Sequence, residues 1–454
     1  MTPERVPRGL RWNLPYLNGV YVAVGAVSDL RLVVDGPYCV VQKAELHMAH
    51  DPASGLVRAD GVGRIGHTDL QLNQNVAYRV TVDRGRDIVQ VLVETSRLPD
   101  TGLVLLTSMD FHQIVAAPLE RYRRAAEKEA GAPIALLPAR SLEADWLQGY
   151  AAVLERVAQV APLPPRTPEP GGVAVIGPLF DRRAGDVFGN QREVSRLLEG
   201  LGLRAVAVWP DGGPIARIAA AAKAELIVSL PYAREAASVL ANRLETPLIE
   251  APLPLGIRDT VAFTQAIATA SGRDAAARDF LARELRSLDA RVRSPAYRYL
   301  AGRRVLVEAE PHIAAGLLGL ADELGLEVAG LVVMGSRDSA EARVTRLLDD
   351  AGASFEPLRT PWPAAGPDPD PPADADVVVA PTLYPRRPGP ATWVPFGYPN
   401  FLSHPIRETP YLGFEGVVWW VERLVEACQT AETYRRGTLL GGEAGFSGDS
   451  GEHW

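Results

Sequence analysis

The chain is long enough for several domains and has the composition of a globular protein. Of its 454 residues, 47% are hydrophobic and 22% are charged, and at about 150 residues per domain this length predicts two to four domains. The net charge of −8 and the lack of a basic stripe argue against a nucleic-acid groove, and no apolar run reaches the roughly 18 residues of a membrane span.

The N-terminal residues 1–15 lack the apolar core of a secretory signal peptide. We therefore expect a cytoplasmic protein, whose two cysteines, Cys39 and Cys428, form no disulfide framework in a reducing compartment. Either cysteine can then be a thiolate ligand or a small buried residue.

Cys39 follows an apolar, strand-like run that starts at Leu30 and breaks at Gly36 and Pro37. These two residues allow a sharp turn and a close approach of the backbone to a bound group. A loop that leads from a parallel strand into a helix start favours anionic sulfur, as a thiolate ligand requires. The alternative is that Cys39 is simply a small buried side chain.

Two groups of polar residues near this run could carry chemistry. The first group, His47, His50 and Asp51, has the spacing of one helical face and could present two imidazoles and a carboxylate to a metal. No other segment completes such a metal site. The alternative is that these histidines lie at a subunit interface or face a substrate. Asp110 and His112 follow a second strand-like run and could donate a proton to a substrate. Helix capping by Asp110 and a solvated His112 explain the same pattern.

A glycine-rich stretch at 61–66 has the spacing G-x-G-x-x-G but lacks the context of a dinucleotide site. No strong strand precedes it, no helix follows it, and no Walker A sequence occurs in the chain. We interpret it as a surface loop.

The first block of the chain ends at a proline cluster, 162–172, and two further blocks repeat one arrangement. They begin at 173–178 and 302–310, each with a β-branched run, a turn, an amphipathic helix that ends at a glycine (Gly202 or Gly325), and a second strand. A linker-like stretch, 363–376, interrupts the third block.

This recurrence predicts an α/β fold of three Rossmann-like domains with parallel sheets. The predicted parts are an N-terminal domain at 1–168, a second domain at 169–298, a third at 299–436 and a flexible tail at 437–454.

Several stretches resemble the nitrogenase component 1 family, in the family's order. They are the segments 18–40, 173–203, 246–268 and 394–424, the last with the Gly-(Phe/Tyr)-Pro, His and Gly-(Phe/Tyr)-x-Gly block. The resemblance implies a subunit of an ATP-dependent two-component reductase. In such enzymes a separate ATP-hydrolysing iron–sulfur protein passes electrons to a cluster held between two related subunits.

The resemblance implies that Cys39 gives one ligand to a shared [4Fe-4S] cluster, with Gly36 and Pro37 shaping the loop. A [4Fe-4S] cluster needs four ligands, normally thiolates, so the other three are expected from a related three-cysteine (α-type) subunit. Where that kind of subunit has a cysteine after the third strand, this chain has Met109 nearby. The chain is thus expected on the one-cysteine (β-type) side of a heterodimer that can double to a heterotetramer.

The resemblance leaves the substrate, a small molecule, undetermined. His404 matches a family histidine position and is expected to serve an interface or structural role, while Cys428 lies in an amphipathic segment and is expected to pack. One alternative is a non-catalytic scaffold on which an iron–sulfur cofactor is assembled. A second is a homodimeric binding protein of periplasmic type, disfavoured by the missing signal peptide.

Overall fold

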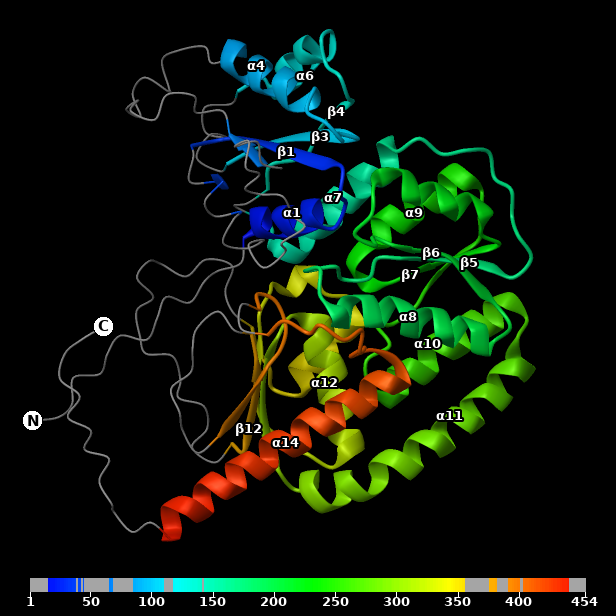
Figure 1. The fold of residues 1–454 in the computed structure, drawn as a ribbon, viewed down its shortest axis with the longest axis vertical. Helices are drawn as coiled ribbons and strands as arrows, with labels where there is room; N and C mark the ends of the chain where they lie inside the picture. Colours follow the sequence, from blue (N-terminus) through cyan, green and yellow to red (C-terminus); the bar gives the residue numbers. More distant parts are fainter. Residues whose placement is uncertain are drawn as a thin grey trace, which may run out of the picture.

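Three parallel sheets follow one another along the chain, each with its own helices (Figure 1). The structure is a computed structural model that describes residues 15–37, 40–41, 44, 65–67, 85–109, 117–140, 143–355, 375–381, 391–400 and 403–440. All pairings between strands of these sheets are parallel. The predicted α/β class with parallel sheets in all three blocks is therefore confirmed.

The first two sheets share one strand order, and the third has a fifth strand at its edge. The order is β2-β1-β3-β4 in the first, β6-β5-β7-β8 in the second and β11-β10-β9-β12-β13 in the third. The strands are β1 (Leu30–Asp35), β2 (Ile65–His67), β3 (Leu103–Ser108), β4 (Ile134–Leu136), β5 (Gly172–Ile176), β6 (Arg204–Trp209), β7 (Leu226–Ser229), β8 (Leu248–Glu250), β9 (Arg304–Ala309), β10 (Glu327–Val333), β11 (Ser354–Phe355), β12 (Val377–Ala380) and β13 (Thr392–Pro395). In each sheet the chain builds outward from its first strand in both directions, which creates a switch point beside that strand.

Helices cover the faces of these sheets. The α-helices are α1 (Tyr16–Gly25), α4 (Gly85–Ser96), α6 (Leu119–Glu127), α7 (Trp146–Val160), α8 (Gly185–Gly200), α9 (Arg234–Leu244), α10 (Gly256–Ser271), α11 (Asp274–Pro295), α12 (Pro311–Leu324), α13 (Ala342–Asp350) and α14 (Gly413–Leu440). Shorter helical turns are η1 (Ile215–Lys223), η2 (Pro231–Ala233), η3 (Ala296–Leu300) and η4 (Arg337–Ser339). The predicted glycine helix ends are confirmed, because Gly202 and Gly325 have positive φ angles of 69° and 73° just after α8 and α12.

Helices α1 and α7 cross with their backbones in contact at two glycines. A Cβ atom at Gly19 would lie 1.6 Å from the carbonyl oxygen of Trp146, and one at Gly149 would lie 2.0 Å from that of Tyr16. Only glycine allows this approach. It holds α1 against α7 so closely that nearly all residues of α1 are buried.

Buried polar contacts join the three blocks to one another. The Asp145 carboxylate begins α7 with a capping box and also accepts a hydrogen bond of 2.7 Å from the backbone N–H of Ser336, in the third block. The Tyr150 hydroxyl, on α7, donates to the carbonyl of Pro178 and accepts from the N–H of Phe180, in the second block, both at 2.9 Å. Helix α7 is therefore bonded to both later blocks.

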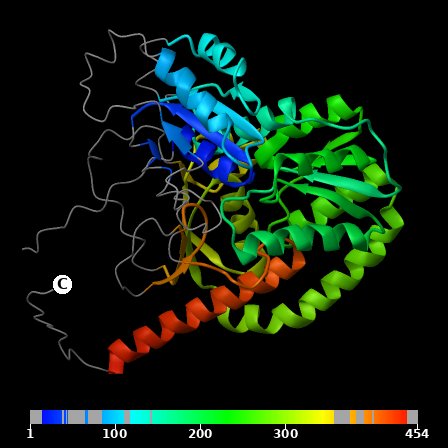
Figure 2. The same cartoon turned by 45° about the horizontal axis from the view of Figure 1, so that its top comes forward.

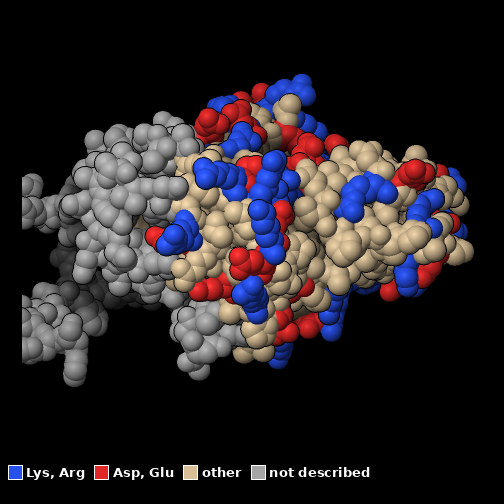
Figure 3. All heavy atoms as spheres, turned by 90° about the horizontal axis from the view of Figure 1, so that it is seen from above, with Lys and Arg blue, Asp and Glu red and all other residues tan. Residues whose placement is uncertain are grey.

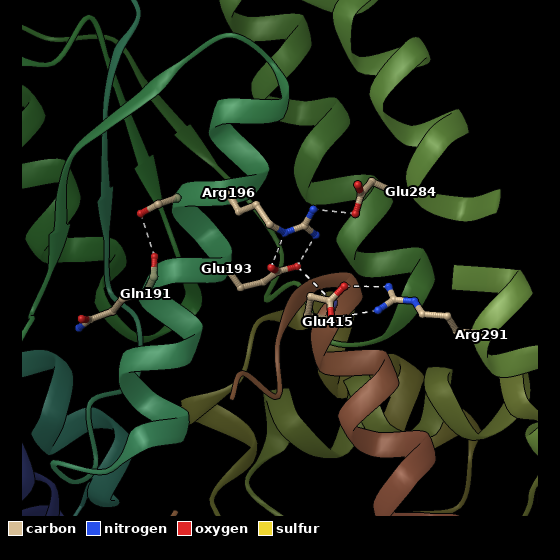
Figure 4. A network of polar contacts seen from close by, with 7 residues as sticks. Gln191, Glu193, Arg196, Glu284, Arg291 and Glu415 are labelled. Carbon is tan, nitrogen blue, oxygen red and sulfur yellow. Dashed lines mark hydrogen bonds and ion pairs between the residues drawn. The ribbon is translucent and has the colours of Figure 1, made fainter. Parts of the chain in front are cut away.

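The start of α14 is held by polar side chains of α8 (Figure 4). Asn190 Oδ1 accepts from the N–H groups of Tyr411 and Leu412 at 3.0 and 3.1 Å. Glu193, whose side chain is 3% exposed, accepts two hydrogen bonds from Arg196 at 2.7 and 2.8 Å and a weaker one from the N–H of Glu415. Helix α14 therefore packs on α8 and α10 of the second block and lies beside α11, as Figure 2 also shows.

We expect Glu193→Ala to destabilise the protein by about 2–4 kcal/mol, because it removes a buried carboxylate that three donors share. Arg293→Ala is the matched control, since its ion pair with Asp289 is exposed on one helix face. It should change the free energy of unfolding by less than about 0.5 kcal/mol. Urea unfolding followed by circular dichroism measures both, and equal midpoints for the two variants would contradict the role given to Glu193.

Two predictions from the sequence need correction. The stretch 61–66 is not wholly a surface loop, because Ile65 and Gly66 belong to β2 and pair with Leu32 and Val33 of β1. Residues 61–64 lie outside the described residues. The predicted tail boundary at 437 falls inside α14, which continues to Leu440. The two domain boundaries at 168 and 298 stay a prediction.

The described surface carries both signs of charge. On the face shown in Figure 3, Lys and Arg side chains are intermingled with Asp and Glu. Exposed ion pairs, such as that of Arg124 with Glu120 on α6, contribute little to stability.

Candidate functional site

The switch point of the first sheet lies between β1 and β3, where the segment that carries Cys39 begins. The Met109 N–H donates to the carbonyl of Asp35 at 3.1 Å, which joins the carboxyl ends of the two strands. A Cβ atom at Gly36 would lie 2.9 Å from both Cγ and Sδ of Met109. Gly36 therefore lets the chain leave β1 in direct contact with Met109, at the position where parallel sheets bind ligands.

The chain continues from this turn over the sheet face that α1 covers. The N–H of Val40 donates to the carbonyl of Pro37 at 3.1 Å, and residues 40, 41 and 44 are helical. Val40 and Ala44 are buried in the main core together with Val34. A strand, a Gly-Pro turn and a helical start therefore follow one another, as the sequence predicts around Cys39.

Thr107, near the carboxyl end of β3, is fully buried at this switch point. It pairs with Val34, so the two side chains project from the same sheet face. Its hydroxyl has no hydrogen-bond partner within the described part of the chain. The neighbouring Ser108 hydroxyl, which projects from the other face, donates to the carbonyl of Met109 at 3.1 Å.

The predicted site residues are only partly described by the structure. Gly36 and Pro37 lie at the switch point, whereas the remaining candidates of the first block lie outside the described residues: Cys39, His47, His50, Asp51, Asp110 and His112. Since β1 and β3 are adjacent, the described ends of the segments that lead to Cys39 and Asp110 are close together. Within the described ranges, no group of three or more His, Cys, Asp or Glu side chains could hold a metal ion.

The two C-terminal candidates lie elsewhere in the fold. Cys428 is 2% exposed in α14, which packs on α8, α10 and α11, so its prediction as a packing residue is confirmed. His404 is exposed in the segment that leads to α14. Its role at an interface or in the structure stays a prediction.

The carboxyl ends of the second and third sheets meet at a buried polar cluster that the sequence reasoning missed. The Tyr232 hydroxyl, after β7, donates to Glu310 Oε1, after β9, at 2.6 Å. Glu310 also accepts from the N–H groups of His312 and Ile313 and so begins α12. Burial, and then the adjacent Glu310 carboxylate, raise the pKa of Tyr232 well above its usual value, so the phenol keeps its proton.

An ion-paired triad lies beside this cluster, in the loop after β5 and the first turn of α8. Arg182 binds Asp181 at 2.8 Å and also pairs with Asp186. Burial raises the pKa of Asp186, and the Arg182 guanidinium opposes that shift. The Tyr411 phenol has a raised pKa because it is buried and faces these carboxylates. These buried polar side chains are paired with one another, and they join the second block to the third.

Sequence signals for part of this junction existed. Glu310 precedes Pro311, and an acidic residue before a proline is a common helix start. The partner Tyr232 is remote in sequence and could be found only from the fold.

A family model described as nitrogenase component 1 type oxidoreductase matches residues 101–429. The chain belongs to this family. It is similar to the B subunit of light-independent protochlorophyllide reductase from Methylobacterium sp. (strain 4-46), with 30% identity over 62% of this chain and 55% of that one. It is also 26% identical to the nitrogenase molybdenum–iron protein beta chain of Frankia alni, over 52% of this chain and 49% of the other.

The nitrogenase component 1 type chain has the fold of solved relatives. It superposes on a structure described as nitrogenase Cp1 at pH 6.5 with a TM-score of 0.71 and 15% identity, over 96% of both chains. By sequence alignment, it spans about half the length of the curated relatives that it matches. Among its described helices none is long and apolar enough to cross a membrane.

Proposed function

We propose that this chain is the one-cysteine (β-type) subunit of an ATP-dependent, nitrogenase-like reductase. In this proposal Cys39 gives one ligand to a [4Fe-4S] cluster shared with a three-cysteine subunit. Family membership supports it, as does the resemblance of residues 18–40 to the opening of the Z subunit of chlorophyllide a reductase. The observation that carries the proposal is the Gly36–Pro37 turn at the β1/β3 switch point, from which the Cys39 segment starts.

The residues around this switch point fit a cluster that is completed by a partner. The chain has two cysteines, and the second, Cys428, is buried in a helix of the third block. One thiolate cannot hold four irons, so three ligands must come from another chain. The buried hydroxyl of Thr107 has no hydrogen-bond partner within the described part of the chain, so it can donate to a bound group.

The other groups of the proposal have separate roles. The cluster, when bound, supplies low-potential electrons to a small-molecule substrate. Asp110 and His112, which follow β3, are the candidate proton donors of this chain. ATP hydrolysis belongs to a separate iron–sulfur reductase protein, because the chain has no Walker A sequence.

Purified alone, the chain should be colourless, and with its three-cysteine partner it should become brown. The physical reason is that a single thiolate leaves three iron sites without protein ligands. Iron analysis and visible absorption of the lone subunit and of the coexpressed pair test this. A brown lone subunit with about four irons per chain would contradict shared ligation, since four is the iron content of one such cluster.

Turnover distinguishes the reductase from a cofactor-assembly scaffold. The pair, its ATPase partner and ATP are incubated with candidate substrates, and in parallel the pair is mixed with an iron-free acceptor protein. A reductase reduces a substrate with ATP consumption and keeps its iron. Transfer of the cluster to the acceptor, without ATP-dependent substrate reduction, would support the scaffold instead.

A further inference from the structure

Thr107 is a residue whose chemistry the packing of this chain does not explain. Its neighbours in β3 from Leu103 to Leu106 are all leucine or valine, and Thr107 is as deeply buried as they are. Leaving a buried hydroxyl without a partner costs about 1–3 kcal/mol. Valine has nearly the same shape and would avoid that loss, so a threonine here indicates an acceptor outside the described residues.

The position of Thr107 limits what this acceptor can be. Thr107 shares its sheet face with Val34, and the core on that face includes Val40, the first described helical residue after the Gly36–Pro37 turn. Two residues beyond Thr107, Met109 contacts Gly36. The hydroxyl is thus buried at the sheet end and on the sheet face over which the Cys39 segment begins.

We infer that the Thr107 hydroxyl donates a hydrogen bond to a sulfur atom of the shared cluster and raises its reduction potential. This inference rests on the proposed function. Hydrogen bonds to cluster sulfurs stabilise the more negative, reduced state, which is how proteins tune such potentials. Thr107 thus tunes electron transfer by direct contact with the cluster and touches no substrate.

The test uses the heterodimer with Thr107→Val, which removes the hydroxyl, and Thr107→Ser, which keeps it. Redox titration followed by electron paramagnetic resonance should show a more negative midpoint potential in the valine variant and a nearly native one in the serine variant. Electron–nuclear double resonance after exchange into D2O should show an exchangeable proton coupled to the cluster in the wild type. That coupling should be lost only with valine.

Ser108→Ala is the matched control, because its hydroxyl projects from the other sheet face and is already bonded to the Met109 carbonyl. It should leave both the potential and the proton coupling unchanged. The isolated chain with Thr107→Val should unfold at no lower urea concentration than the wild type, since no bond within the chain is lost.

The outcomes separate this inference from the proposed function. An unchanged potential with valine, or a wild-type cluster without an exchangeable coupled proton, overturns the inference and leaves shared ligation intact. The double-resonance result on the wild type decides even if the valine variant does not assemble. A wild-type heterodimer that contains no cluster overturns the proposed function itself.

Discussion

Cys39→Ala should abolish stable cluster binding in the heterodimer while the two subunits still associate. An iron that loses its thiolate has an open coordination site, whereas most of a subunit interface is side-chain packing. Because the loss of a ligand's outer partner already reduces metal affinity or activity about 10- to 100-fold, the loss of a ligand should reduce electron transfer at least as much. Iron content, visible absorption, the reduced-state paramagnetic signal and size-exclusion chromatography measure these effects.

Two variants serve as controls for this experiment. Cys39→Ser could keep a weaker oxygen ligand and should retain part of the iron. Cys428→Ala should keep all of it and lose about 1 kcal/mol of stability, because it removes a small buried side chain. If Cys39→Ala matched the wild type in iron and activity, Cys39 would be a packing residue and the reductase proposal would lose its chemical basis.

Gly149→Ala should destabilise the protein by about 3 kcal/mol or more, the upper end of what overpacking costs. The new Cβ would lie 2.0 Å from the Tyr16 carbonyl oxygen. Both elements are helix backbone, so α1 and α7 would have to move apart along their whole contact. A lower urea midpoint and a lower soluble yield are the expected results.

Gly319→Ala is the matched control for this substitution. Gly319 is also inside a helix, α12, but a Cβ there would meet no atom within 4 Å. Alanine should therefore stabilise the protein by about 0.5–1 kcal/mol through its better helix propensity. Equal midpoints for the two variants would show that the crossing of α1 and α7 adapts to a methyl group.

Local sequence signals were sufficient for the regular parts of the fold. The apolar runs at β5 and β9 form strands that are followed by helices, and the glycines at 202 and 325 have the left-handed conformation that ends a helix. These features depend on neighbouring residues alone. They therefore predicted three parallel α/β blocks.

Tertiary contacts decided what the sequence could not show. Val20, Val22 and Val24 are β-branched and favour strands, yet they lie in α1 because Gly19 allows the helix to pack directly on α7. Strand β2 has three residues and depends on its pairing with β1.

In the candidate site, too, some features follow from adjacent residues and others depend on tertiary contacts. The Gly36–Pro37 turn before Cys39 could be predicted from adjacent residues. The contact of Gly36 with Met109 and the burial of Thr107 depend on the pairing of β1 with β3, and a single sequence does not reveal which strands become neighbours.

The packing of α7 against helices of two blocks couples the unfolding of those blocks. It packs against α1 on one side and α9 on the other, and Arg243 of α9 binds the carbonyls of Ala158 and Ala161 at its end (Figure 1). A helix shared in this way cannot open without exposing apolar surface of both blocks. The first two sheets should therefore unfold as one cooperative unit, and the amides of α7 should exchange with solvent only as slowly as that whole unit opens.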